Sequence, residues 1–112
     1  MNNRIDKVNQ NIKKQLSEII QKQQDFPKAI ITVTRVDTSS NLIHSKVFIS
    51  VIPDSYQTEV VKYLNKNIYD IQQKINKGLR MRPVPKIKFF AEQETIRAAR
   101  IEEILKNIDQ DN

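Results

Sequence analysis

Residues 29–52 read AIITVTRVDTSSNLIHSKVFISVI. Two runs rich in β-branched residues, 29–36 and 42–52, flank five short polar residues that favour a turn because their side chains bond their own backbone. The pattern predicts a β-hairpin. In the second run Val47, Ile49 and Val51 share one parity, and the opposite parity carries His44, Lys46, Phe48 and Ser50. This alternation predicts a sheet that helices cover on one side only.

Helical patterns lie on both sides of the hairpin. Residues 3–24 predict a helix because apolar residues recur at steps of three and four, at Ile5, Val8, Ile12, Leu16, Ile19 and Ile20. Pro27 ends that element. A second helix is predicted to begin near Asp54 and Ser55 and to stop at Gly78, the only glycine, in a left-handed conformation. Because that span is long for a small domain, we expect a kink inside it.

The rest of the chain predicts one more strand and one more helix. Residues 79–85 form an extended connection because of their prolines, and residues 86–91 alternate like a third strand. Residues 94–108 predict a short closing helix, and residues 109–112 a frayed polar end. The result is an α+β chain in the order α-β-β-α-β-α. With 112 residues and 38% hydrophobic content, we expect a single domain over residues 1–108.

The composition excludes several classes of protein. The absence of cysteine excludes disulfides, thiolate metal sites and a cysteine nucleophile. No apolar stretch approaches the length that leaves or spans a membrane, so we expect a cytoplasmic protein with no membrane partner. The sequence offers no nucleophile with a base, no metal-ligand cluster and no glycine-rich phosphate loop. We therefore expect no catalytic residue, metal, cofactor or small-molecule substrate.

The charge pattern favours an anionic partner such as nucleic acid. The net charge is +6, and no acidic residue stands between Asp70 and Glu92. That interval holds six cations, which we predict to contact phosphates: Lys74, Lys77, Arg80, Arg82, Lys86 and Lys88. Arginines at alternate positions of an extended segment are expected to point the same way. A second group, on the first helix, is either a solvated face or a phosphate contact: Arg4, Lys7, Lys14 and Lys22.

Aromatic side chains could stack on unpaired bases. The candidates are Tyr69 and Phe48, with core packing as the alternative role for each. Phe89 and Phe90 lie in the third strand, where at least one ring is expected in the core. His44, the lone histidine, alternates with Lys46 and is predicted to be a surface side chain.

The chain resembles the ribosome-binding factor A family of bacterial assembly factors over nearly its whole length. The features that carry the resemblance are Lys7-Val8, Phe26-Pro27, Ser39-Ser-Asn-Leu42, Ser45-Lys-Val-Phe-Ile49, Leu79-Arg-Met-Arg-Pro-Val-Pro85 and Ile87-Lys-Phe-Phe90. The resemblance implies a type II KH-like fold with a helix-kink-helix in the middle. It also implies association with the free 30S small ribosomal subunit and its 16S rRNA, and support for late rRNA maturation without catalysis.

The sequence departs from that family at the kink. Where the family has Ala-x-Gly, this chain has Asn67-Ile68-Tyr69. Asn tolerates left-handed geometry better than most residues, but Tyr69 in the glycine place obstructs close approach of another backbone. Two outcomes follow from this: either the kink is milder, or the ring takes over part of the contact.

These observations predict one candidate RNA-binding surface on a monomer. Its residues are Lys46, Lys66, Asn67, Ile68, Tyr69, Lys74, Lys77, Arg80, Arg82, Lys86 and Lys88. Phosphate contacts would position the protein, and RNA shape would supply specificity. Two alternatives stay open: a protein-protein adaptor that docks a partner through the hairpin edge or the last helix, and a general single-stranded RNA or DNA binder.

Overall fold

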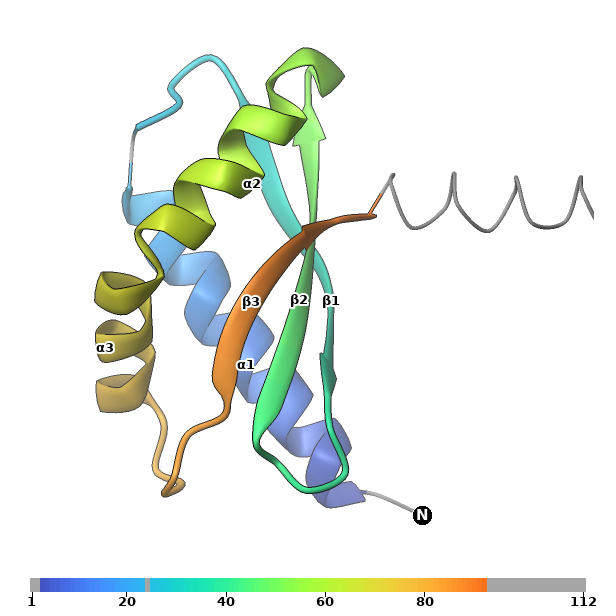
Figure 1. Ribbon diagram of the computed structural model, residues 1–112, viewed down its shortest axis with the longest axis vertical. Coiled ribbons are helices and arrows are strands. Elements are labelled where there is room, and N and C mark those ends of the chain that lie inside the picture. The colour runs from blue at the N-terminus through green and yellow to red at the C-terminus, as the bar shows by residue number, and fades with distance from the viewer. Residues whose placement is uncertain (1–2, 24, 93–112) are drawn as a thin grey trace, which may run out of the picture.

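The computed structural model describes residues 3–23 and 25–92. Its elements are α1 (Asn3–Lys22), β1 (Ile30–Thr38), β2 (His44–Ile52), the 3-10 turn η1 (Asp54–Tyr56), α2 (Gln57–Lys66), α3 (Ile68–Gly78) and β3 (Lys86–Ala91), as Figure 1 shows. The predicted α-β-β-α-β order is confirmed over this part. The helix expected at 94–108 and the end at 109–112 lie outside the described residues.

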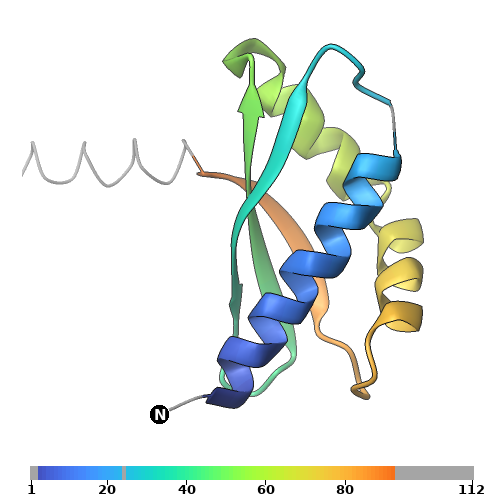
Figure 2. The ribbon, with the colours of Figure 1, turned by 180° about the vertical axis from the view of Figure 1, so that it is seen from behind.

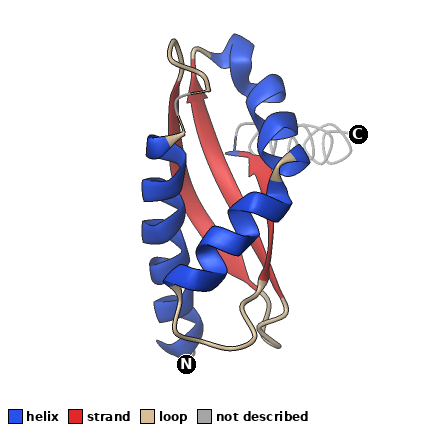
Figure 3. Ribbon diagram, turned by 90° about the vertical axis from the view of Figure 1, so that its left-hand side faces the viewer, coloured by secondary structure: helices blue, strands red, loops and turns tan. Residues whose placement is uncertain are grey.

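The strands form one sheet that the helices cover on a single face. The strand order is β1-β2-β3, with β1 antiparallel to β2 and β2 parallel to β3. Figure 3 shows α1, α2 and α3 together in front of the sheet. The one-sided sheet predicted from the alternation in β2 is therefore confirmed. The opposite face of the sheet, which we call the open face, carries the alternate side chains.

The core lies between the sheet and the helices. One side of α1 contributes Val8, Ile12 and Leu16, and the sheet contributes side chains of one parity, among them Val47, Ile49 and Phe89. Phe89 is buried in this core, as expected for one of the two adjacent phenylalanines. Ile71 and Ile75 close it from α3. Fully burying an aliphatic side chain stabilises the fold by roughly 1.5–3 kcal/mol, so the apolar stripes hold the two layers together.

The central helix is broken at Asn67, as the sequence predicted. α2 ends at Lys66 and α3 begins at Ile68, with Asn67 at φ −99° and ψ 22° between them. Both the backbone N–H and the side-chain amide of Asn67 donate to the Tyr63 carbonyl, at 3.0 and 2.8 Å. The break therefore needs no left-handed residue, because the amide supports the last turn of α2 while the chain changes direction.

The predicted left-handed stop at Gly78 is wrong. No glycine in the described residues has a positive φ, and Gly78 is the last residue of α3. A Cβ built on Gly78 would clash with the Gln15 side chain of α1. That contact is with the far end of a flexible side chain, which could move aside, and the chain leaves α3 through an extended Leu79.

The hairpin turn lies two residues further along the chain than the sequence suggested, because β1 extends to Thr38 and β2 begins at His44 rather than at Leu42. Asp37 and Thr38 belong to β1 rather than to the turn, and Leu42 holds the positive φ, at 62°. Thr38 and Ser45 are buried and share a hydrogen bond of 2.8 Å, and Thr38 also donates to Asn9 of α1. Since buried hydroxyls need partners, this network extends the strand pairing and ties the hairpin to α1.

Side-chain amides close the outer edge of β3. Asn65 of α2 donates to the Phe89 carbonyl at 3.0 Å and accepts from the Phe89 N–H at 2.9 Å. Gln72 of α3 accepts from the Ile87 N–H at 2.9 Å and donates to the Pro85 carbonyl at 3.0 Å. These amides take the place of a neighbouring strand, and they fix both halves of the broken helix against the sheet.

Replacing Asn65 with Ala should lower the free energy of unfolding by about 1–3 kcal/mol, because one N–H and one carbonyl of β3 lose their partner in a partly buried place. Urea denaturation monitored by circular dichroism measures the change. Gln73→Ala on the exposed side of α3 is the matched control and should change the value by less than about 0.5 kcal/mol. Equal effects of the two variants would contradict the role given to Asn65.

Candidate nucleic-acid interface

The strand register places cations side by side on the open face. Lys46 of β2 lies opposite Lys88 of β3, and His44 lies opposite Lys86. All four side chains are exposed. Lys46 and Lys88 repel each other as like charges directly across the sheet, so a bound anion would relieve that repulsion. Asp37 of β1, which pairs with Lys46 on its other side, offsets part of the positive charge.

Another part of the open face is occupied by a small cluster of stacked side chains, Arg35, Phe48 and Phe90. The Arg35 guanidinium lies 3.7 Å from the centroid of the Phe48 ring, and its Nε donates to Glu92 Oε1 at 3.2 Å. The Phe90 ring packs against Phe48 with centroids 5.7 Å apart. Phe48 is only 7% exposed as a result. Its role is packing, so the candidate stacking role of Phe48 is not supported.

The helix layer carries the remaining predicted side chains. Lys66, Lys74 and Lys77 are exposed on α2 and α3. At the kink, Tyr69 is 72% exposed, whereas Ile68 packs against the core and Asn67 is held by the Tyr63 carbonyl. Tyr69 is therefore the kink side chain that is free to contact a base.

The loop between α3 and β3 separates the two arginines that were expected to point the same way. Residues 81–83 form bends rather than an extended strand. Arg82 Nη1 donates to the carbonyls of Leu79 and Met81, at 2.8 and 2.6 Å, and so holds the loop together. Arg80 lines a cavity with Arg4 and Lys7 of α1. The prediction that Arg80 and Arg82 point the same way is therefore wrong, because the bends at residues 81–83 break the alternation of an extended segment.

The predicted cations fall into three groups rather than one patch. Lys46, Lys86 and Lys88 lie on the open face; Lys66, Lys74 and Lys77 lie in the helix layer; Arg80 and Arg82 lie in the loop that connects the two layers. Within the described part of the chain, none of these eight side chains takes part in an ion pair. Their charge is therefore available to an anionic partner, which would have to reach around one end of the domain.

The structure also places three residues beside predicted cations in pairings that the sequence did not predict. His44 lies beside Lys86, and the pair Arg4 and Lys7 lies beside Arg80. Strand pairing and helix-to-loop contacts cannot be read from a single sequence. The one available signal was the placement of Arg4 and Lys7 on one side of α1, which the sequence left open between solvent and phosphate.

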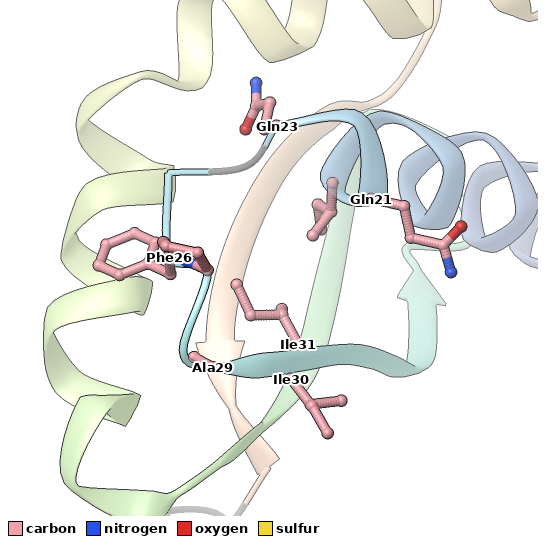
Figure 4. A pocket seen from close by; sticks show the side chains of 8 residues that line it. Gln21, Gln23, Phe26, Ala29, Ile30 and Ile31 are labelled. Carbon is pink, nitrogen blue, oxygen red and sulfur yellow. The ribbon is translucent and has the colours of Figure 1, made fainter.

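A cavity at the other end of α1 lies apart from these cations. It has a volume of about 500 Å³ and is lined by residues of the α1–β1 connection, including Phe26, Ala29, Ile30 and Ile31 (Figure 4). The described residues that line it include two glutamines and no ionisable side chain. Across residues 3–23 and 25–92, no cluster of three potential metal ligands occurs. The same part of the chain contains no helix with the length and apolar character needed to cross a membrane.

The sheet topology, the broken central helix and the exposed cations define the class of this protein: a type II KH-like α+β domain. The profile of the family described as Ribosome-binding factor A matches residues 4–105. The chain therefore belongs to the ribosome-binding factor A family, as its sequence features implied.

Individual relatives agree with this assignment. Ribosome-binding factor A of Natranaerobius thermophilus is 33% identical over 113 residues, which span 97% of this chain and 86% of that relative. The crystal structure of ribosome-binding factor A from Thermus thermophilus has a TM-score of 0.70 at 20% identity, covering 80% of this chain and 97% of that one. A Thermus thermophilus homology model fitted into the cryo-EM map of a 30S complex has a TM-score of 0.62 at 22% identity, covering 71% and 86%. At these identities the two structures show the fold alone.

The two aromatic candidates should respond differently to truncation. Phe48→Ala should lower the free energy of unfolding by about 3 kcal/mol because it removes the ring beneath Arg35. Tyr69→Ala should leave it within about 0.5 kcal/mol, since that ring is mostly in solvent. Denaturant titration of both variants measures the contrast. A large destabilisation by Tyr69→Ala would show that this ring packs rather than remaining available to a base.

Proposed function

We propose that this chain binds the free small ribosomal subunit through its 16S rRNA and supports maturation of that RNA without catalysis, as a monomer in the cytoplasm. The observation that carries the proposal is family membership together with eight exposed or loop-held cations that make no ion pair in the described part of the chain. A relative from Thermus thermophilus has been fitted into a map of its 30S complex, which supports the same partner here.

The geometry supports contact with a folded RNA more than with a free strand. The cations run from the open face, around the α3–β3 loop, to the helix layer, and Figures 1 and 3 show that loop at one end of the domain. A surface of this shape suits two neighbouring stretches of ribose-phosphate backbone. Phosphate contacts of this kind position a protein, while the shape of the RNA supplies specificity.

The kink adds one side chain that can contact a base. The Tyr69 ring lies in solvent just after Lys66 in the chain, at the place where the family has glycine. Stacking of a base on an aromatic ring contributes roughly 1–3 kcal/mol and tolerates any base. We assign Tyr69 this role in place of the close backbone approach that a glycine would permit.

Charge reversal on either layer should weaken binding to small subunits. The double variants are Lys46→Glu with Lys88→Glu on the open face and Lys74→Glu with Arg80→Glu on the helix side. Each should remove most of the co-sedimentation with 30S particles and lower the slope of log affinity against log salt by roughly 0.7–0.9 per lost contact. Ultracentrifugation at several salt concentrations provides both values.

The control is Lys13→Glu with Lys62→Glu, which changes the net charge equally at exposed positions outside the candidate surface. It should retain binding, and its salt slope should match that of the unaltered chain. An affinity that barely changes with salt in the unaltered chain would instead favour the protein-protein adaptor. Equal binding to unstructured RNA and to intact subunits would favour a general single-strand binder.

A non-catalytic role in maturation makes a separate prediction. Depletion of the protein in its host should raise the fraction of 16S rRNA that keeps its precursor 5′ end, as measured by primer extension. Incubation of the purified protein with precursor rRNA alone should leave that end uncut. Cleavage that persists after the preparation has been freed of contaminating nucleases would contradict the assignment.

A further inference from the structure

A second cavity lies where the start of α1 meets the α3–β3 loop. Its volume is about 350 Å³, and it is lined by Arg4, Lys7, Val8, Asn11, Leu79, Arg80 and Met81. Figure 2 shows α1 crossing in front of the sheet, with its first turns at the same end of the domain as that loop. Cavities that hold small ligands in proteins typically occupy roughly 300–1,000 Å³, so this space is large enough for one nucleotide unit.

The helix side of the cavity is polar and positive. Arg4, Lys7 and Asn11 follow one another at steps of three and four, so they share one face of α1. All three side chains are exposed. Arg80 adds a third cation from the loop, and among the described residues that line the cavity there is no carboxylate. Arginine and lysine around one cavity favour a phosphate group, which can accept several of their hydrogen bonds.

The remaining walls are apolar and fixed in place. Val8 and Leu79 are buried members of the core, and Met81 packs against that core from the loop. The guanidinium of Arg82 binds the carbonyls of Leu79 and Met81, so the loop wall is held from behind. A thioether and branched aliphatic groups suit the flat face of a base, since sulfur and methyl groups make favourable contacts with aromatic rings.

Because its lining holds both cations and apolar side chains, this cavity differs from a site that binds phosphate alone. Cations alone would bind any polyanion, whereas the part of Met81 that the core leaves exposed would remain in water unless a ring covered it. Asn11 supplies both a donor and an acceptor at the rim, which is the chemistry that pairs with the edge of a base. A protein segment is less suitable, because acidic side chains lack a ring and aromatic side chains lack the negative charge.

We propose that this cavity, the α1–loop pocket, takes one unstacked nucleotide of a single-stranded RNA segment. The phosphate lies among Arg4, Lys7 and Arg80, and the base lies against Val8, Leu79 and Met81. This inference rests on the proposed function for the source of the RNA, and it extends the interface onto α1, where the sequence left the role of the cations open.

The chain provides its own probe, because Met81 lines the pocket and is one of only two methionines in the sequence. The full chain is labelled with ¹³C at the methionine methyl groups and titrated with a single-stranded hexa-adenylate RNA. In parallel it is titrated with inorganic polyphosphate of matched charge. The Met81 methyl proton signal should shift upfield with the RNA, because a base ring lies over it, and should keep its position with polyphosphate.

Two charge reversals on α1 complete the test. Lys7→Glu should weaken RNA binding at least about tenfold and suppress the Met81 shift. Lys14→Glu makes the same change in charge on the same helix outside the pocket lining. It should leave the RNA affinity and the Met81 shift nearly unchanged. In each variant without RNA, the Met81 signal should keep the position that it has in the unaltered chain. This control shows that the pocket is still folded.

Three results would overturn the inference: RNA that binds without moving the Met81 signal, polyphosphate that moves it as much as RNA does, or Lys14→Glu that weakens binding as strongly as Lys7→Glu. The proposed function fails separately. Absence of co-sedimentation with small subunits, while the Met81 shift persists, refutes the ribosomal partner and leaves the pocket. Co-sedimentation without the Met81 shift refutes the pocket and leaves the partner.

Discussion

The closed edge of β3 is the constraint on which the rest of the structure depends. A strand at the edge of a sheet exposes backbone donors and acceptors that must find partners. Here the amides of Asn65 and Gln72 provide them, one from each half of the broken helix. Since both halves are tied to the same strand, the kink between them and the loop that follows α3 have defined positions. The cations of α3 and of the loop are placed by those bonds.

The sources of stability and of charge are separate in this protein. The helix-facing side of the sheet and one stripe of each helix form the core, and the cations remain at the surface. Because core burial supplies the stability, the surface can hold Lys46 beside Lys88 in spite of their repulsion. Two arginines are exceptions: the Arg82 guanidinium holds the loop backbone, and the Arg35 guanidinium packs on Phe48 and pairs with Glu92.

The kink shows how a family feature can be kept with different residues. A glycine would allow another backbone to approach closely, and this chain has Tyr69 in that place. Asn67 nevertheless breaks the helix with an ordinary negative φ, because its amide satisfies the Tyr63 carbonyl. The Tyr69 ring then points into solvent. The helix is thus broken at Asn67 and the Tyr69 ring is exposed, while the contact that this ring would make stays a prediction.

The sequence by itself determined the elements and their order, because apolar periodicity reports which side of each helix and strand is buried. It determined the one-sided sheet from the parity of Val47 and Ile49, and the residues of β3 from the alternation after Pro85. Only the tertiary structure decided which surfaces those elements share. The pairing of Lys46 with Lys88, the burial of Phe48 beneath Arg35 and the meeting of Lys7 with Arg80 all join residues far apart in the chain. The backbone of Gly78 was misjudged as well: it continues α3 instead of taking a left-handed conformation, and its neighbour Gln15 lies on another helix, where local patterns carry no information.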